Sequence, residues 1–192
     1  MNVINFSRLA FILLVVSVLL VAPAPPSLSQ RPRDVEKQIS ELLAKMTLEE
    51  KLGQLQQLDG EGNGTFRPEH PELIRKGLLG STLNVRGAKN TNQLQHVAMD
   101  ESRLKIPVLF GFDVIHGYRT IFPIPLAEAS SFDPTLAEQS TSVAAREAYS
   151  TGLRWTFAPM LDIARDPRWG RITEGAGEDP YLGAAFARAR VL

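Results

Sequence analysis

The segment Ile106–Gly117, IPVLFGFDVIHG, places a carboxylate directly after an apolar run. Residues Val108–Phe112 predict a strand buried on both faces, as in a parallel sheet. Asp113 follows this run, and ligands of α/β folds bind where parallel strands end. Asp113 is therefore a candidate ligand-binding residue, with a simple turn cap as the alternative. His116 is expected to be a structural hydrogen-bonding group beside it rather than a catalyst.

A second segment, APMLDIARDPRWGRITEGAGEDP at residues 158–180, combines charged side chains, glycines and an aromatic ring. Its charged residues are Asp162, Arg165, Asp166, Arg168, Arg171, Glu174, Glu178 and Asp179. Trp169 lies between two of the arginines. Guanidinium groups donate paired hydrogen bonds, and pyranose faces stack on aromatic rings. The segment therefore indicates a sugar-binding loop, with a solvated charged loop as the alternative.

The sequence lacks the motifs of several other kinds of catalytic and ligand-binding site. The chain has no cysteine, which excludes disulfides, thiolate metal sites and a cysteine nucleophile. The three histidines have no metal-ligand spacing, and neither HExxH nor GxSxG occurs. Gly175-Ala176-Gly177 lacks the third glycine of a dinucleotide-binding loop. Lys+Arg and Asp+Glu both number 21, so no charge excess favours nucleic acid or an anionic membrane. We expect no metal and no cofactor.

Two helices are predicted before the segments that carry these residues. Residues 34–46 have the apolar stripe of an amphipathic helix that begins at Asp34. Thr47 and Glu50 form a capping box that begins a second helix. Its predicted buried residues are Leu48, Leu52 and Leu55. Residues 59–65, DGEGNGT, are predicted to be loop.

The rest of the chain alternates between helices and strands. Helices are predicted at residues 71–76, 90–103, 134–150 and from 181 onward, and strands at 78–85, 106–112 and 154–163. Asp133-Pro134 and Asp179-Pro180 are typical helix starts. The alternation predicts an α/β fold with a parallel sheet and right-handed crossovers. A composition of 44% hydrophobic and 22% charged residues is typical of a globular domain.

Residues 1–29 differ from the rest of the chain. Arg8 is their only charged side chain, residues 9–22 are almost entirely apolar, and three prolines follow. This pattern predicts a secretory signal peptide, and hence a secreted or periplasmic protein with no stable membrane span once the peptide is removed. An uncleaved N-terminal anchor is the alternative, although the apolar run is shorter than a membrane span requires.

Three stretches resemble glycoside hydrolase family 3 enzymes of the β-glucosidase type: MTLEEKLGQL at 46–55, RLKIPVLFGFDVIHGYRTIFP at 103–123 and APMLDIARDPRWGRITEGAGEDPYL at 158–182. The resemblance implies that residues 30–192 are the N-terminal part of a TIM-like (β/α)8 barrel, with about three βα units. It implies a retaining exo-glycosidase that releases terminal β-linked glucose-type sugars. By resemblance, Asp113 and Arg171 bind the sugar. His116, Asp162, Trp169 and Glu178 are candidate supports of that pocket.

The sequence differs from the family pattern in its catalytic motifs. The sequence contains neither the Lys-His pair that grips the sugar nor the Ser-Asp motif of the nucleophile. The resemblance therefore implies that nucleophile and acid/base lie beyond Leu192 and that this chain is an inactive fragment. Two alternatives remain: a non-catalytic carbohydrate-binding remnant, and β-xylosidase or another specificity of the family. The preferred sugar, the linkage and the oligomeric state are not predicted.

Overall fold

The computed structural model describes residues 34–191, so the predicted signal peptide lies outside the described residues. The chain divides into an N-terminal unit that ends at Leu42 and a larger unit that begins at Leu43. Helix α2 (Val35–Lys45) begins as predicted at Asp34, whose Oδ1 accepts a hydrogen bond from the Lys37 amide at 3.1 Å. Within residues 34–191, no helix has the length and apolar character needed to cross a membrane.

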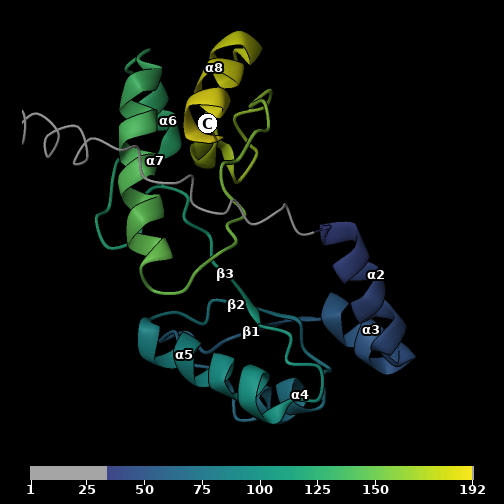
Figure 1. Cartoon of the computed structure of the whole chain (residues 1–192). Helices are drawn as coiled ribbons and strands as arrows, with labels where there is room; N and C mark the ends of the chain where they lie inside the picture. Colours follow the sequence, from purple (N-terminus) through teal and green to yellow (C-terminus); the bar gives the residue numbers. More distant parts are fainter. Residues whose placement is uncertain (1–33, 192) are drawn as a thin grey trace, which may run out of the picture. The chain divides into compact units, whose positions relative to one another are not determined.

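Three short parallel strands form the sheet of the larger unit (Figure 1). They are β1 (Gln57–Asp59), β2 (Ser81–Leu83) and β3 (Leu109–Gly111), in that spatial order. In the register, Leu58 lies opposite Thr82, and Thr82 lies opposite Phe110. Helices connect the successive strands, so the prediction of an α/β fold with a parallel sheet is confirmed.

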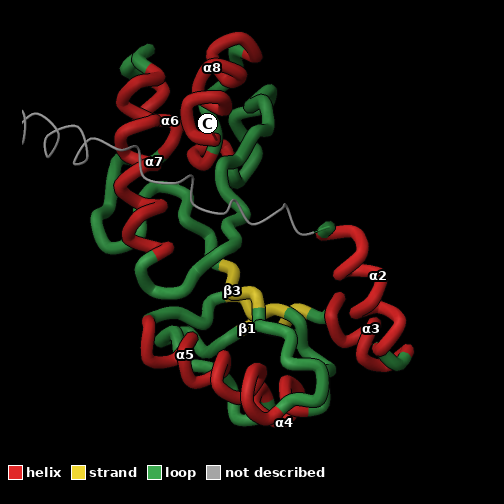
Figure 2. The backbone as a smooth tube through the Cα atoms, viewed as in Figure 1, coloured by secondary structure: helices red, strands yellow, loops and turns green. Residues whose placement is uncertain are grey.

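One strand was not predicted, and one predicted strand does not form. β1 lies where a loop and the end of a helix are expected. Residues 154–163 are not a strand, and they contribute only an isolated bridge between Trp155 and Gly111. This segment pairs with the sheet on one side, and Pro159 has no amide hydrogen to extend the pairing. Figure 2 shows the chain between α7 and α8 as loop, apart from one short helical turn.

Helix α3 (Leu48–Leu55) begins at the predicted capping box but buries another face. The Glu50 amide donates to Thr47 Oγ1 at 3.2 Å, and the Thr47 amide donates to Glu50 Oε2 at 2.9 Å. The three leucines expected in the core are instead 59–83% exposed, namely Leu48, Leu52 and Leu55. Glu50 and Gly53 face inward instead. Glu50 does so because Arg103 pairs with it, with Nε 3.0 Å from Oε1.

Helices α4 (His70–Arg75) and α5 (Ala88–His96) pack on one face of the sheet, and a π-helical turn (Val97–Glu101) continues α5. Gly77, at φ +74°, follows α4 and ends the helical turn. The core between these helices and the strands includes Phe110, which is 1% exposed. Its other members are Ile74, Leu79, Val85, Leu94, Val97, Ala98, Val108, Ala148 and Leu153.

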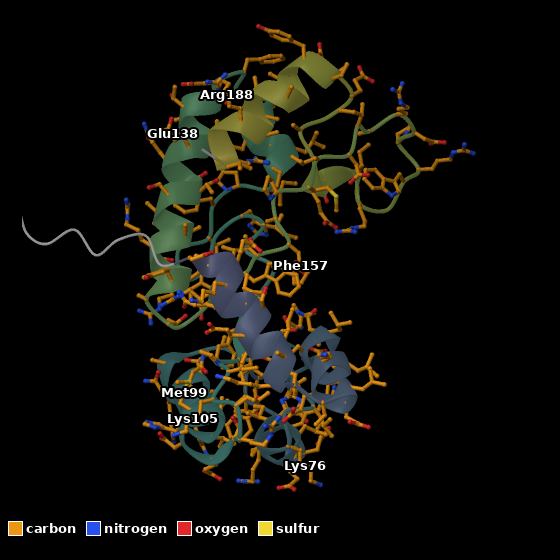
Figure 3. The ribbon with its side chains drawn as sticks, turned by 45° about the vertical axis from the view of Figure 1, so that its right-hand side comes forward. Lys76, Met99, Lys105, Glu138, Phe157 and Arg188 are labelled. Carbon is orange, nitrogen blue, oxygen red and sulfur yellow. The ribbon has the colours of Figure 1, made fainter. Side chains whose placement is uncertain are left out.

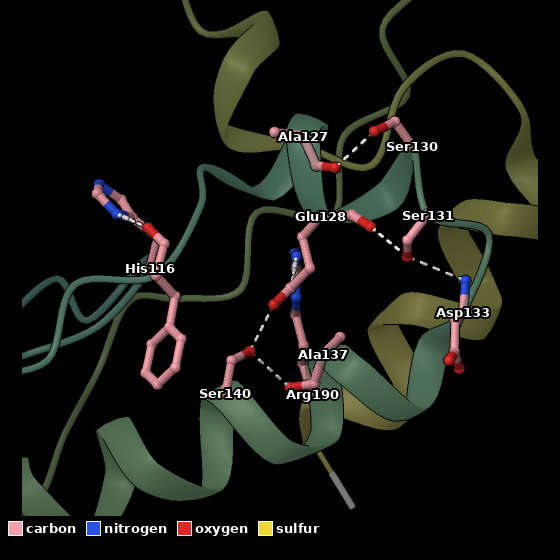
Figure 4. A network of polar contacts seen from close by, with 10 residues as sticks. His116, Ala127, Glu128, Ser130, Ser131, Asp133, Ala137, Ser140 and Arg190 are labelled. Atoms are coloured by element: carbon pink, nitrogen blue, oxygen red, sulfur yellow. Dashed lines mark hydrogen bonds and ion pairs between the residues drawn. The ribbon is translucent and has the colours of Figure 1, made fainter.

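The last three helices pack against one another around Phe186. They are α6 (Pro125–Ala129), α7 (Pro134–Tyr149) and α8 (Pro180–Val191). The predicted caps of α7 and α8 are confirmed, since the carboxylates of Asp133 and Asp179 accept hydrogen bonds from the first-turn amides. Arg190 on α8 pairs with Glu128 on α6 at 2.6 Å, and both side chains are less than a tenth exposed (Figure 4).

Candidate functional site

The sheet face that the helices leave uncovered opens into a hollow of about 340 Å³. Gln57, Leu83, Asp113, Ile115, Phe157, Met160, Arg171 and Glu174 line it. Side chains alternate between the faces of a strand, so Leu109 is 41% exposed while its neighbour Phe110 is 1% exposed. The expectation that this strand is buried on both faces is therefore wrong at Leu109. The chain covers one face of the sheet and leaves the other open.

Asp113 lies at the carboxyl edge of this open face. It follows β3 after a single intervening residue, and its side chain is exposed. Within residues 34–191, no amide donates a hydrogen bond to its carboxylate, although a turn cap needs one. The adjacent Val114 amide donates to Thr156 Oγ1 at 3.3 Å instead. The Asp113 carboxylate is thus available to a ligand in the hollow.

Arg171 reaches the same hollow from the long loop before α8. It precedes a 3-10 turn (Ile172–Glu174), and its Nε and Nη2 donate to Glu174 Oε1 and Oε2 at 3.0 and 2.7 Å. This pair raises the pKa of the Arg171 guanidinium and lowers the pKa of the Glu174 carboxyl. The charges of Asp162 and Asp113 add smaller upward contributions to the pKa of Arg171. The structure therefore brings Asp113 and Arg171 together.

Glu174 is the charged residue of this lining that was not among the candidates from the sequence. Its spacing of three residues from Arg171 was the available signal, because such neighbours meet on a helical turn. In a loop rich in alternating charges, that spacing does not distinguish one pair from several others. The local 3-10 turn decides which pair forms.

His116 lies outside the hollow. Its Nδ1 is 3.0 Å from the carbonyl oxygen of Phe122, and the Phe122 amide donates to the His116 carbonyl at 2.8 Å (Figure 4). These contacts close the loop after Asp113, which gives His116 a structural role in the described residues. Its role as a support of the pocket stays a prediction.

The other three candidates also lie outside the lining of the hollow. Trp169 is half-buried in a turn, with its amide donating to the Asp166 carbonyl at 3.0 Å. Asp162 and Glu178 are exposed. Phe157, labelled in Figure 3, is the aromatic residue of the lining. A Cβ on Gly111 would lie 3.3 Å from its ring. Gly111 therefore leaves room for this ring beside the sheet.

A second hollow, of about 350 Å³, lies between α7 and residues 153–159. Its lining is mostly apolar and contains no carboxylate. Across residues 34–191, no group of three or more His, Cys, Asp or Glu side chains could hold a metal ion. The second hollow therefore lacks the carboxylates that accept hydrogen bonds from hydroxyl groups, whereas the hollow around Asp113 has them.

Comparisons with known proteins relate the chain to one family of enzymes. The family profile described as "Glycosyl hydrolase family 3 N terminal domain" matches residues 47–192. The chain is 42% identical over 158 residues to a periplasmic β-glucosidase of Salmonella typhimurium, covering 80% of this chain and 20% of that protein. It is 30% identical over 162 residues to a β-xylosidase/α-L-arabinofuranosidase of Medicago sativa, covering 82% of this chain and 18% of that protein.

Solved structures show the same relationship. A β-glucosidase of Listeria innocua in complex with glucose superposes with a TM-score of 0.71 at 39% identity, covering 81% of this chain and 23% of that one. Other structures of that enzyme hold laminaribiose or isofagomine. The chain spans about a fifth of the length of the curated relatives it matches.

Proposed function

Because the chain belongs to glycosyl hydrolase family 3, we propose that its hollow binds the terminal non-reducing sugar of a β-linked glycoside. The observation that carries the proposal is that Asp113 and Arg171, from separate segments, line one hollow on the open face of the parallel sheet. Ligands of α/β folds bind at this edge. The sugar complexes of the Listeria enzyme support a carbohydrate as the ligand.

The two side chains are complementary to sugar hydroxyl groups. The carboxylate oxygens of Asp113 accept hydrogen bonds, and the guanidinium of Arg171 donates them. A hydroxyl does both, so a sugar can satisfy the two residues together. Each charged hydrogen bond contributes roughly 1.5–3 kcal/mol, and more is lost when a buried partner is left without one.

We propose that these residues serve a larger retaining glycosidase, which cleaves the glycoside through a covalent glycosyl-enzyme. Such a reaction needs a nucleophilic carboxylate and an acid/base carboxyl about 5–5.5 Å apart. The family's Ser-Asp and Lys-His motifs do not occur in these 192 residues. The chain also corresponds to only 20% of the Salmonella β-glucosidase. We therefore assign sugar binding to this chain and bond cleavage to residues outside it.

Substitution of Asp113 in the complete enzyme tests the sugar site. Asp113→Asn keeps the shape but replaces an acceptor with a donor, so kcat/KM for an aryl β-glucoside should fall at least ~10-fold, since 1.4 kcal/mol corresponds to one decade. The melting temperature should change little, because Asp113 is exposed. Asp100→Asn is the matched control, because Asp100 lies in the π-helical turn after α5 and is not part of the hollow's lining. It should leave kcat/KM unchanged. Unchanged kinetics with a lower melting temperature for Asp113→Asn would refute the sugar site.

The sugar specificity has two candidates. The similarity to the Salmonella β-glucosidase suggests a β-glucoside as the substrate, whereas the similarity to the Medicago β-xylosidase/α-L-arabinofuranosidase suggests a β-xyloside. Comparing kcat/KM for the two aryl glycosides in the complete enzyme separates them, and we propose the glucoside because of the higher sequence identity. Sugar binding without turnover of either substrate would identify a non-catalytic binding protein instead.

We also propose export of the protein, because residues 1–29 have a signal-peptide pattern and the Salmonella relative is named as periplasmic. N-terminal sequencing of the mature protein provides the test. Recovery of a chain that still begins at Met1 and sediments with membranes would contradict the proposal.

A further inference from the structure

Both carboxylate oxygens of Glu174 accept hydrogen bonds from Arg171. This pairing leaves one edge of the guanidinium available to a ligand. We propose that Glu174 is a positioning residue that turns the Nη1–Nη2 edge of Arg171 toward two neighbouring hydroxyls of the bound sugar. The inference rests on the proposed sugar site and adds a specificity for a vicinal diol. It assigns Glu174 no contact with the sugar itself.

The planar shape of the guanidinium explains why one of its edges remains available to a ligand. A guanidinium carries five N–H groups in a plane, and these form two edges that can each donate a parallel pair. Glu174 occupies the Nε–Nη2 edge through both of its oxygens. Within residues 34–191, neither N–H group of Nη1 nor the second one of Nη2 has an acceptor. One N–H of Nη1 and the second N–H of Nη2 together form the edge that a pair of adjacent hydroxyl oxygens can match.

Exposure shows which partner is the anchor. The Glu174 side chain is 26% exposed, whereas that of Arg171 is 57% exposed. The two residues begin and end one short turn, in which the Glu174 amide donates to the Arg171 carbonyl at 3.1 Å. The carboxylate is thus fixed closer to the protein, and it restricts a longer and more exposed guanidinium. An Arg side chain that is already ordered loses less conformational entropy when it binds a ligand.

Asp113 supplies the complementary half of the recognition. It lines the same hollow, and no donor in the described part of the chain binds its carboxylate. Glu174 also lines the hollow, but Arg171 already satisfies its two oxygens. The two carboxylates therefore have different roles: Asp113 accepts from sugar hydroxyls, and Glu174 orients the donor.

A second pair in the same loop provides an internal comparison. Arg168 donates to Asp166 through Nε and Nη2 at 3.0 and 2.6 Å, which is the same two-bond arrangement. Neither residue lines the hollow, and the Arg168 side chain is 89% exposed. Asp166→Asn therefore removes an equivalent ion pair from this loop without altering the proposed sugar contacts.

The complete enzyme allows a double-mutant test with an aryl β-glycoside. Glu174→Gln keeps the shape but replaces one acceptor with a donor facing Arg171, so kcat/KM should fall ~10-fold. In an Arg171→Ala background, the same change should have little further effect, because Glu174 acts through Arg171. For glycosides that lack one of the two matched hydroxyls, the loss caused by Glu174→Gln should disappear. Asp166→Asn should leave kcat/KM unchanged.

The outcomes separate this inference from the sugar site itself. If Arg171→Ala leaves kcat/KM unchanged, the sugar-binding role of Arg171 fails. If Arg171→Ala lowers kcat/KM but Glu174→Gln does not, or if the two losses are independent, the sugar site stands and the positioning role is overturned. A lower melting temperature of Glu174→Gln with unchanged kcat/KM would also overturn it, since that result describes a purely structural ion pair.

Discussion

His70, the first residue of α4, is a histidine with no exposed surface. Neither of its ring nitrogens has a hydrogen-bond partner among the described residues. Burial lowers the pKa of the His70 imidazole, because the charged ring would lose its hydration. His70 is therefore neutral in the folded protein at neutral pH.

This burial predicts a loss of stability as the solution is acidified. In the unfolded chain His70 has a pKa of about 6.5, so the unfolded state binds a proton more readily than the folded state does. The free energy of unfolding should therefore decrease as the pH falls below that value, until the lowered folded-state pKa is passed. We expect the melting temperature to fall from pH 7.5 to pH 5.5, and His70→Gln to reduce this fall.

His96→Gln provides the control, because His96 is exposed and its side chain is 78% accessible. That substitution should leave the pH dependence of the melting temperature close to that of the unaltered protein. If His70→Gln retains the full pH dependence as well, another group is responsible for it.

At the scale of residues, the sequence predicted the site residues that belong to a sequence motif. It did not predict residues whose role depends on how the chain packs. Asp113 and Arg171 belong to the stretches that resemble the family, and the structure places them in one hollow. Glu174 required knowledge of a 3-10 turn, and His70 required knowledge of how α4 packs on the sheet. Tertiary packing of this kind leaves no local signal in the sequence.

At the scale of elements, the starts of helices were predictable because caps are local. Thr47, Asp133 and Asp179 all accept hydrogen bonds from amides of the helices that follow them. The buried face of α3 was not predictable from its leucines. Gly53 lies on the other side of this helix from the leucines. The need for a glycine there is visible only in the structure, where the backbone of α3 meets the backbone at Gly77 and Leu78.

Gly53 is required where α3 meets the segment before β2. A Cβ at this position would lie 2.4 Å from the Gly77 carbonyl oxygen and 2.5 Å from the Leu78 Cα. Both atoms belong to the backbone and cannot rotate away. Alanine favours helices by about 1 kcal/mol over glycine, but overpacking costs typically 1–3 kcal/mol, and backbone clashes lie at the upper end.

Gly53→Ala should therefore lower the melting temperature despite the better helix propensity of alanine. A net loss of about 1–2 kcal/mol corresponds to a shift of roughly 2–8 °C in a domain of this size. Gly62→Ala is the control, because a Cβ at Gly62 meets nothing within 4 Å. A melting temperature for Gly53→Ala equal to or above that of Gly62→Ala would show that the two backbones can separate without cost.

At the scale of the whole molecule, the open sheet face and the hollow around Asp113 are the same feature. The helices cover the side that carries Phe110, and the side that carries Asp113 is left with an exposed Leu109 and the hollow. The prediction of a parallel α/β fold was possible from the alternation of helices and strands. The positions of the strands could not be predicted, because the strands are short. For example, β1 has 3 residues and lacks a clear alternating pattern.

The 192-residue chain by itself should bind a glycoside without hydrolysing it. A retaining mechanism needs one carboxylate as nucleophile and one carboxyl whose pKa is raised so that it can donate a proton. In the hollow, Arg171 lowers the pKa of the Glu174 carboxyl, which is the wrong direction for an acid, and Asp113 is the other carboxylate in the lining. Aryl β-glucoside release by the purified chain, once circular dichroism has shown that it is folded, should equal that of a heat-denatured sample. Turnover above this background that is abolished by Asp113→Asn or Glu174→Gln would place the chemistry in this chain and overturn the division of roles proposed above.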